Sequence, residues 1–355
     1  MTPELGIIEG FFGRPYSWAE RADMVRALAP AGYGFYLYAP KADARLRRGW
    51  REPYGDVELE ALGDFAQTCH DAGVRFGMGL SPYELFHAFD AAARDALAAK
   101  LAQLDRLGLD DLGVFFDDMR GDLPDLAARQ VEIVHWIAGR TRASRVVTCP
   151  SYYADDPVLD RVFGQRPDGY LEDLGAGLDP KIDIMWTGEE VCSREFSPGH
   201  LARVGEQMGR KPFLWDNYPV NDGPRMSRHL HLRAFTGRPS TIAPHVAAHA
   251  INPASQPVLS QIPALTLAES YHEGSRYQYL GAFRRAAEAV LGAELADGVE
   301  RTLPLLEDAG LDGISAEQKI RLRDRFAAFD HPGAREILGW LDGAFAIGAE
   351  ELQTQ

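Results

Sequence analysis

The strongest constraint on the fold is an alternation of short apolar runs with longer stretches of helical spacing, repeated along the chain. Each run is short and rich in aromatic or β-branched residues, as buried strands are. About eight such strand–helix units follow one another within roughly the first 270 residues. This number and order favour a parallel (β/α)8 TIM barrel, with a doubly wound sheet as the alternative fold.

The apolar runs and their end signals place the individual elements. We expect strands at residues 5–10, 34–39, 74–80, 112–116, 145–149, 182–186, 212–215 and 246–251. We expect helices at residues 18–31, 56–72, 90–107, 123–139, 157–165, 197–208 and 255–268. Ser17 and Glu20 have the spacing of a capping box at the first helix. The stretch 225–244 is the weak unit, because it contains proline and glycine and alternates histidine with leucine.

Strand patterns disappear after about residue 270. Apolar positions then recur with helical spacing, and Ser315 and Gln318 again have the spacing of a capping box. We therefore predict two domains, the barrel over residues 1–270 and a small all-α domain over residues 271–355.

The charge of the chain disfavours some classes of binding partner, and its cysteine content indicates the compartment. Lys plus Arg number 37 and Asp plus Glu 52, a net charge of -15 that disfavours binding to nucleic acid or an anionic membrane. The three cysteines, far apart in sequence, indicate free thiols in a reducing compartment. No apolar run is long enough to span a bilayer, and the first residues lack the features of a signal peptide. We expect a cytoplasmic protein.

Two adjacent acids, Asp117 and Asp118, directly follow the apolar run 112–116. Carboxylates a few ångströms apart are not easily ionised together, so one of them can hold its proton and act as a general acid. The alternative is that the pair caps a turn or a helix. Neighbours on a regular strand point to opposite faces, so both acids reach one site only if the strand ends at Phe116 or Asp117.

The other predicted strands also end in polar or aromatic residues. In a barrel these ends face one site, and aromatic rings with Asn, Asp and Lys between them suit a sugar, whose C–H faces stack on rings and whose hydroxyls need directional partners. The residues are Glu9, Gly10, Phe12, Lys41, Asp43, Ser81, Tyr83, Tyr152, Tyr153, Trp186, Thr187, Trp215, Asn217, Asn221, Asp222 and Asn252.

Some of these residues also have a purely structural interpretation. Trp186 and Trp215 can be core residues, and Lys41 can be a solvated side chain. His245 and His249 invite a metal interpretation, but on a strand their spacing places them on one face, too far apart for easy chelation. We expect no metal ion and no cofactor.

Several strand-end motifs occur in a specific order, of which the eight-residue run at 215–222 (WDNYPVND) is the most specific. The others are residues 9–15 (EGFFGRP), 38–41 (YAPK), 116–118 (FDD), 149–150 (CP), 186–188 (WTG) and 252–253 (NP). Together they resemble the motifs of family 84 of the glycoside hydrolases, the O-GlcNAcase and hyaluronidase-like family of β-N-acetylglucosaminidases. The resemblance covers about the first 270 residues, and the later helices suit the helical region of bacterial relatives.

The resemblance implies a retaining exo-β-N-acetylglucosaminidase whose substrate supplies the nucleophile, the oxygen of its own 2-acetamido group. Asp117 would accept the acetamido N–H, and Asp118 would protonate the leaving oxygen and later deprotonate water, with an oxazoline as the intermediate. The implied substrate contacts are Asn217, Asp222 and Asn252 to hydroxyls and ring, Lys41 and the Gly10 carbonyl to the far side, Tyr153 to the acetamido group, and Trp215 lining its pocket.

Three positions depart from the family pattern, namely Phe12 for Tyr, Ala42 for Asp and Tyr152 for Glu, and they leave the substrate preference open. A non-catalytic N-acetylhexosamine-binding barrel is the alternative function, and a metal-dependent hydrolase is a third. The expected partner is a small-molecule or protein-linked N-acetylglucosamine glycoside, with no nucleic acid and no membrane.

Overall fold

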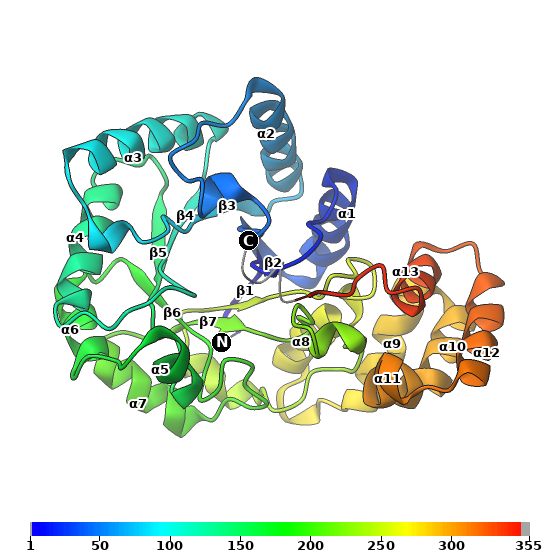
Figure 1. Ribbon diagram of the computed structural model, residues 1–355. Helices are drawn as coiled ribbons and strands as arrows, with labels where there is room; N and C mark the ends of the chain where they lie inside the picture. Colours follow the sequence, from blue (N-terminus) through cyan, green and yellow to red (C-terminus); the bar gives the residue numbers. More distant parts are fainter. Residues whose placement is uncertain (1, 349–355) are drawn as a thin grey trace.

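A closed barrel of parallel strands forms the body of the protein. The computed structural model describes residues 2–348, and in this part of the chain the strands follow one another around the barrel in sequence order (Figure 1). They are β1 (Glu4–Glu9), β2 (Tyr33–Tyr38), β3 (Arg75–Leu80), β4 (Asp111–Phe115), β5 (Arg145–Cys149), β6 (Asp183–Trp186), β7 (Phe213–Asp216) and β8 (Ala248–Ile251). The predicted (β/α)8 fold is therefore confirmed.

The barrel closes where β1 pairs with β8 in parallel, from Glu4 opposite Ala248 to Ile7 opposite Ile251. Inside the barrel the rings of Phe35 and Phe213 pack with their centroids 5.5 Å apart. A Cβ on Gly6 would lie 2.1 Å from the Phe35 ring, so a glycine is required on β1 for this packing. The interior is a packed core, and any cavity has to lie at an end of the strands.

Charged residues close the amino-terminal end of the barrel. Glu4 lies 3.0 Å from Arg145, which also contacts Asp183 at 2.7 Å, and Arg75 lies 3.2 Å from Asp111. Each of these side chains belongs to the first residue of its strand, in β1, β3, β4, β5 and β6. In a TIM barrel, residues at this end of the strands contribute to stability rather than to catalysis.

Helices surround the barrel. They are α1 (Trp18–Leu28), α2 (Asp56–Asp71), α3 (Ala91–Leu104), α4 (Leu126–Ala138), α5 (Pro157–Phe163), α6 (Tyr170–Gly177), α7 (Pro198–Met208) and α8 (Gln261–Glu273). The predicted capping box of Ser17 and Glu20 is present at α1. The weak unit has no α-helix, since residues 217–247 contain only the short 3-10 helices Met226–Arg228 and Ser240–His245.

Two helices differ from the prediction. The helix α6 was not expected from the sequence. The helix α8 begins at Gln261, later than predicted, and in the segment before it the N–H groups of residues 258 and 259 donate to the carboxylate of Glu336. This contact comes from the far end of the chain, so no local pattern contains it.

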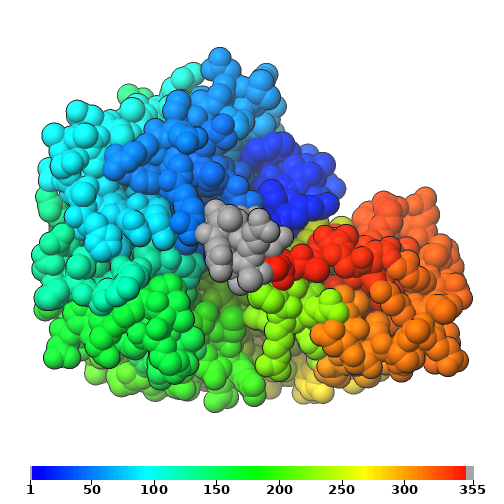
Figure 2. Space-filling model, in the orientation of Figure 1, coloured from blue at the N-terminus to red at the C-terminus, as the bar shows by residue number. Residues whose placement is uncertain are grey.

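The remaining helices pack together on one side of the barrel, beside α8 (Figures 1 and 2). They are α9 (Tyr279–Leu291), α10 (Ala293–Leu303), α11 (Gly310–Gly313), α12 (Ala316–Ala327) and α13 (Pro332–Leu341), with a π-helical turn at Pro304–Ala309. Their core, which includes Phe326 and Trp340, is a separate hydrophobic cluster that also takes in Leu230 and Leu232 from between β7 and β8. The predicted division after residue 270 falls within α8 and stays a prediction.

The described residues contain no helix that combines the length and the apolar character needed to cross a membrane. All three cysteines are free thiols, and Cys69 and Cys149 are buried while Cys192 is exposed.

Candidate functional site

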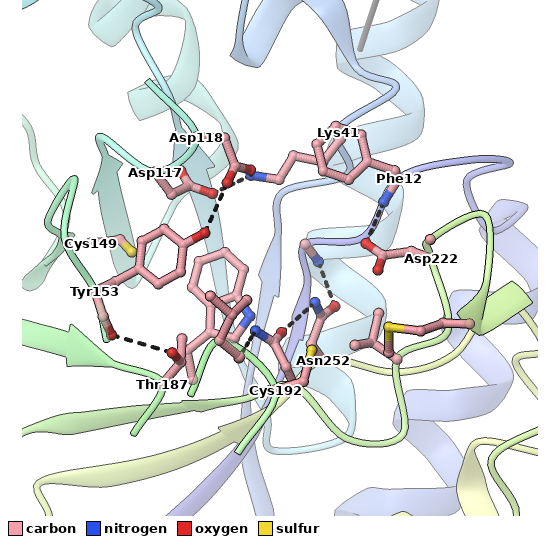
Figure 3. Close-up of a pocket in the computed structure, with 17 residues that line it drawn as sticks. Phe12, Lys41, Asp117, Asp118, Cys149, Tyr153, Thr187, Cys192, Asp222 and Asn252 are labelled. Carbon is pink, nitrogen blue, oxygen red and sulfur yellow. Dashed lines mark hydrogen bonds and ion pairs between the residues drawn. The ribbon is translucent and has the colours of Figure 1, made fainter. Parts of the chain in front are cut away.

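A cavity of about 230 Å³ opens at the carboxyl ends of the strands (Figure 3). All nine residues to which the resemblance assigned a role line it, which are Gly10, Lys41, Asp117, Asp118, Tyr153, Trp215, Asn217, Asp222 and Asn252. Of the other strand-end residues expected to face the site, Glu9, Asp43, Ser81, Tyr83, Tyr152, Trp186 and Asn221 do not line it. The nine residues come from the ends of, or loops after, β1, β2, β4, β5, β7 and β8. The parallel register of the barrel therefore gathers into one cavity residues that are far apart in the sequence.

The two adjacent acids reach the same cavity because the strand ends before them. The strand β4 ends at Phe115, and Asp118 adopts a left-handed backbone conformation with φ of 57°. A positive φ is uncommon in residues other than glycine, and such conformations concentrate at functional sites. The alternation of a regular strand is broken here, so both carboxylates line one cavity as the sequence analysis required.

Lys41, which follows β2, reaches the two acids, which follow β4. Its ammonium contacts Oδ2 of Asp117 and lies 3.3 Å from Oδ2 of Asp118. The hydroxyl of Tyr153 donates to Oδ1 of Asp118 at 2.9 Å. The resemblance implies that Lys41 contacts the far side of a sugar, which stays a prediction; in this structure its ammonium lies on the two carboxylates.

Two nearby cations, Lys41 and Arg47, favour the ionised form of Asp118. Burial raises the pKa of Asp118, but the ammonium of Lys41 and the guanidinium of Arg47 outweigh burial and hold the pKa below its ordinary value. Burial likewise lowers the pKa of Lys41, and the two carboxylates raise it by more. The adjacent carboxylates predicted a raised pKa for one of the two acids, and for Asp118 the direction is the opposite, because the Lys41 ammonium contacts both acids.

Trp215 forms the floor of the cavity and is 5% exposed. Its ring packs on Phe115, the last residue of β4, with centroids 5.4 Å apart. A Cβ on Gly10 would lie 2.4 Å from this ring, so the glycine allows β1 to approach Trp215 closely. The Trp215 Nε1 is buried and has no hydrogen-bond partner among the described residues.

Trp186 is a core residue, so the expectation that it belongs to the site is wrong. It is fully buried, and its Nε1 donates to Nε2 of His200 on α7 at 3.0 Å. Side chains on a strand alternate between the two faces of the sheet, and Trp186 lies on the face that packs against the helices. Its neighbour Thr187 is the residue that reaches the cavity.

Two amides in the cavity are held in a fixed orientation by a chain of hydrogen bonds. Asn252 Oδ1 accepts from the Gly10 N–H at 3.2 Å, and its Nδ2 donates to Oδ1 of Asn217 at 3.0 Å. Asn217 Nδ2 in turn donates to the Val191 carbonyl at 2.7 Å. Amides oriented in this way present defined donors and acceptors to a polyhydroxylated ligand.

Asp222 closes the side of the cavity opposite the acid pair (Figure 3). Its Oδ2 accepts from the Phe12 N–H at 2.9 Å. Burial, with a smaller effect from the charge of Asp118, raises the pKa of Asp222 to about 6, although the Phe12 N–H opposes the rise. A buried carboxylate of this kind is a strong acceptor for the hydroxyl groups of a sugar.

Beneath the cavity, Asp216 at the end of β7 binds two partners that sequence reasoning missed. Arg238 pairs with Asp216 at 2.6 Å, and His249 on β8 approaches it at 3.0 Å. The other ring nitrogen of His249 lies 2.8 Å from the Tyr271 hydroxyl. Both nitrogens of His249 are thus engaged within the protein, and the described residues contain no cluster able to hold a metal ion.

Several cavity residues had no assigned role in the sequence analysis. They are Phe12, Cys149, Thr187, Val191, Cys192, Val220, Gly223 and Met226. Cys149 and Thr187 lie within the strand-end motifs, so the sequence could have indicated that they belong to the site. Met226 lies in the irregular segment after β7, where no sequence pattern indicated a site residue. Of the three departures from the family pattern, Phe12 lines the cavity, and Ala42 and Tyr152 do not.

Comparisons with known proteins agree with this geometry. A family model described as beta-N-acetylglucosaminidase matches residues 5–303. The Protein O-GlcNAcases of Mus musculus and Rattus norvegicus are each 28% identical over 275 residues, which is 75% of this chain and 30% of theirs. The chain therefore spans less than a third of the length of these curated relatives.

A solved structure is similar over more of its length. It is a mutant of the O-GlcNAc hydrolase of Thermobaculum terrenum, with a TM-score of 0.80 and 28% identity. The similarity covers 95% of this chain and 80% of that one, so it includes the helices after the barrel.

Proposed function

The chain belongs to the β-N-acetylglucosaminidase family, family 84 of the glycoside hydrolases, and we propose that it is a retaining exo-β-N-acetylglucosaminidase. The observation that carries the proposal is the pair of adjacent carboxylates, Asp117 and Asp118, that open into one cavity floored by Trp215. A ring on the floor and acids on one wall can bind a sugar face and act on its anomeric centre.

In the proposed reaction the substrate supplies its own nucleophile. Asp117 accepts the acetamido N–H, and the acetamido oxygen attacks the anomeric carbon while the bond to the leaving oxygen breaks. Asp118 donates its proton to that oxygen while Asp117 takes the proton of the acetamido nitrogen, so a neutral oxazoline forms. Asp118 then takes a proton from a water molecule whose oxygen attacks the anomeric carbon and opens the oxazoline. Asp117 returns its proton to the nitrogen, and the β configuration is restored.

The rest of the cavity fits a single N-acetylhexosamine. Its volume of about 230 Å³ is below the ~300–1,000 Å³ typical of sites for drug-sized ligands, which supports exo action on one terminal sugar. Together, Asn217, Asp222 and Asn252 would bind the hydroxyl groups of the sugar. Cys149 and Thr187 line the same cavity and would lie around the acetamido methyl.

The names of the relatives guide the choice of substrate. The mammalian relatives are called Protein O-GlcNAcase and the bacterial structure an O-GlcNAc hydrolase. We accordingly propose N-acetylglucosamine linked to a protein, or to a small aglycone, as the substrate class.

Hydrolysis of an aryl β-N-acetylglucosaminide tests the function. We expect turnover by the unaltered protein and a loss of about 10²- to 10⁴-fold in kcat for Asp118→Ala, the usual contribution of a general acid. Aryl glycosides of N-acetylgalactosamine and glucose serve as comparison substrates, and glucosides, which lack the acetamido group, should not react. Full activity of Asp118→Ala would refute the assignment. Binding of N-acetylglucosamine without turnover of any substrate would favour the non-catalytic barrel.

A further inference from the structure

Lys41 enters the cavity and engages both acids of the proposed catalytic pair (Figure 3). The side chain is 5% exposed. Its ammonium lies 5.6 Å from the centre of the Phe12 ring and 5.8 Å from that of Trp215. The ammonium is therefore surrounded by the side chains that would enclose a bound sugar.

Lys41 contacts one oxygen of each acid. On Asp117 this oxygen is Oδ2, while Oδ1 is buried and has no hydrogen-bond partner in the described chain. On Asp118, Oδ1 accepts from Tyr153 and Oδ2 faces Lys41. An acetamido N–H and a leaving oxygen cannot take these positions while the ammonium stays.

We propose that the ammonium of Lys41 pairs with both carboxylates in the free protein and leaves them when the sugar binds, so that binding is accompanied by uptake of a proton at Asp118. This inference rests on the proposed function. When the ammonium moves away, Asp118 loses the cation that favours its ionised form, takes a proton from solvent, and becomes the neutral acid that the first step requires. A lysine suits this role because its ammonium is carried on a flexible stem.

Other titratable groups around the pair are Arg47, Cys149, Tyr153 and Asp222. Arg47 lies 3.5 Å from the carbonyl oxygen of Asp117 and 3.4 Å from that of Asp118, so its position is tied to the backbone. Burial raises the pKa of Cys149 and of Tyr153 well above their ordinary values, which keeps both groups neutral. Lys41 is thus the charge whose movement can change the state of Asp118.

The pH profiles of catalysis test the proposal, since kcat/KM reports the free enzyme and kcat the complex. The alkaline limb, where Asp118 loses its proton, should lie about one pH unit or more lower in kcat/KM than in kcat, a tenfold or larger change in proton affinity. In Lys41→Met the limb of kcat/KM should move up toward that of kcat, whereas in Lys41→Arg it should stay. A role limited to sugar contact would raise KM and leave the limbs unmoved.

Calorimetry gives a readout that needs no turnover. N-acetylglucosamine is titrated near pH 6 into the protein in two buffers of different ionisation enthalpy, and the difference measures proton uptake. We expect uptake by the unaltered protein and by Lys41→Arg, and its loss in Lys41→Met. Coincident alkaline limbs with no proton uptake in the unaltered protein would overturn the proposal, as would equal uptake in all three proteins. Absence of hydrolysis together with lysine-dependent uptake would instead refute the proposed function.

Discussion

At the residue scale, two consecutive tyrosines show how sharply the site is defined. The hydroxyl of Tyr153 donates to Asp118 at 2.9 Å inside the cavity. The hydroxyl of Tyr152 donates to the Gly164 carbonyl at 2.7 Å and does not line the cavity. The two side chains have the same chemistry, so each is a control for the other.

We predict that Tyr153→Phe lowers kcat/KM on an aryl β-N-acetylglucosaminide by about 10- to 100-fold, because a hydrogen bond to a charged group contributes about 1.5–3 kcal/mol. Tyr152→Phe should keep kcat/KM within about twofold, since it loses only a bond to a carbonyl outside the site. Steady-state kinetics of the two variants measures kcat/KM, and thermal unfolding checks that both variants are folded. Equal losses in both would show that the hydrogen bond to Asp118 has no special role.

At the scale of elements, the C-terminal helices hold loops that follow β7 and β8. Glu336 on α13 accepts the N–H groups of residues 258 and 259 at 2.8 and 2.9 Å. Glu307, in the π-helical turn after α10, accepts those of residues 232 and 233, both at 3.1 Å. These two carboxylates anchor the irregular segments that follow the strands bearing Asp216 and Ile251.

The burial of Glu336 predicts a pH dependence of stability. Burial raises its pKa to about 8, although the two N–H groups oppose the rise. The folded protein therefore holds a proton that the unfolded chain, with a glutamate pKa of about 4.3, releases. Between these two values the contribution of Glu336 to the free energy of unfolding falls as the pH rises.

In Glu336→Gln this contribution is absent, so we expect a smaller drop in Tm between pH 5 and pH 8 than in the unaltered protein. The exposed Glu317 on α12 offers the control, since Glu317→Gln should leave the drop unchanged. Calorimetric melting curves at several pH values measure the effect. An identical pH dependence in the Glu336→Gln variant and the unaltered protein would contradict it.

At the scale of the whole molecule, most of the fold could be predicted because the alternation of strands and helices has a simple physical cause. Parallel strands covered on both faces read as continuous apolar runs, and these runs located β1 to β8. The short helix α6 contains two glycines and lacked a clear helical pattern. The segment before α8 is bound by Glu336, a contact from far along the chain that no local rule can supply.

Most of the candidate site could also be predicted, because the apolar runs that locate the strands also locate the strand ends. Strand ends of a parallel barrel meet at one edge, so naming those ends placed Asp117, Asp118 and Trp215 in one cavity. Which face a strand-end residue occupies was harder, as Trp186 shows. The contact of Lys41 with both acids depends on the distance between the ends of β2 and β4, which are separated by β3, and the sequence contains no signal for that distance.

The central claim is that the acetamido group of the substrate is the nucleophile, with Asp117 and Asp118 serving it. A series of aryl β-glucosaminides with zero to three fluorines on the acetyl methyl tests this most directly, since each fluorine makes the acetamido oxygen less nucleophilic and leaves the leaving group unchanged. We predict that kcat falls steeply with every added fluorine in the unaltered protein. A kcat that is independent of fluorine content would contradict the account.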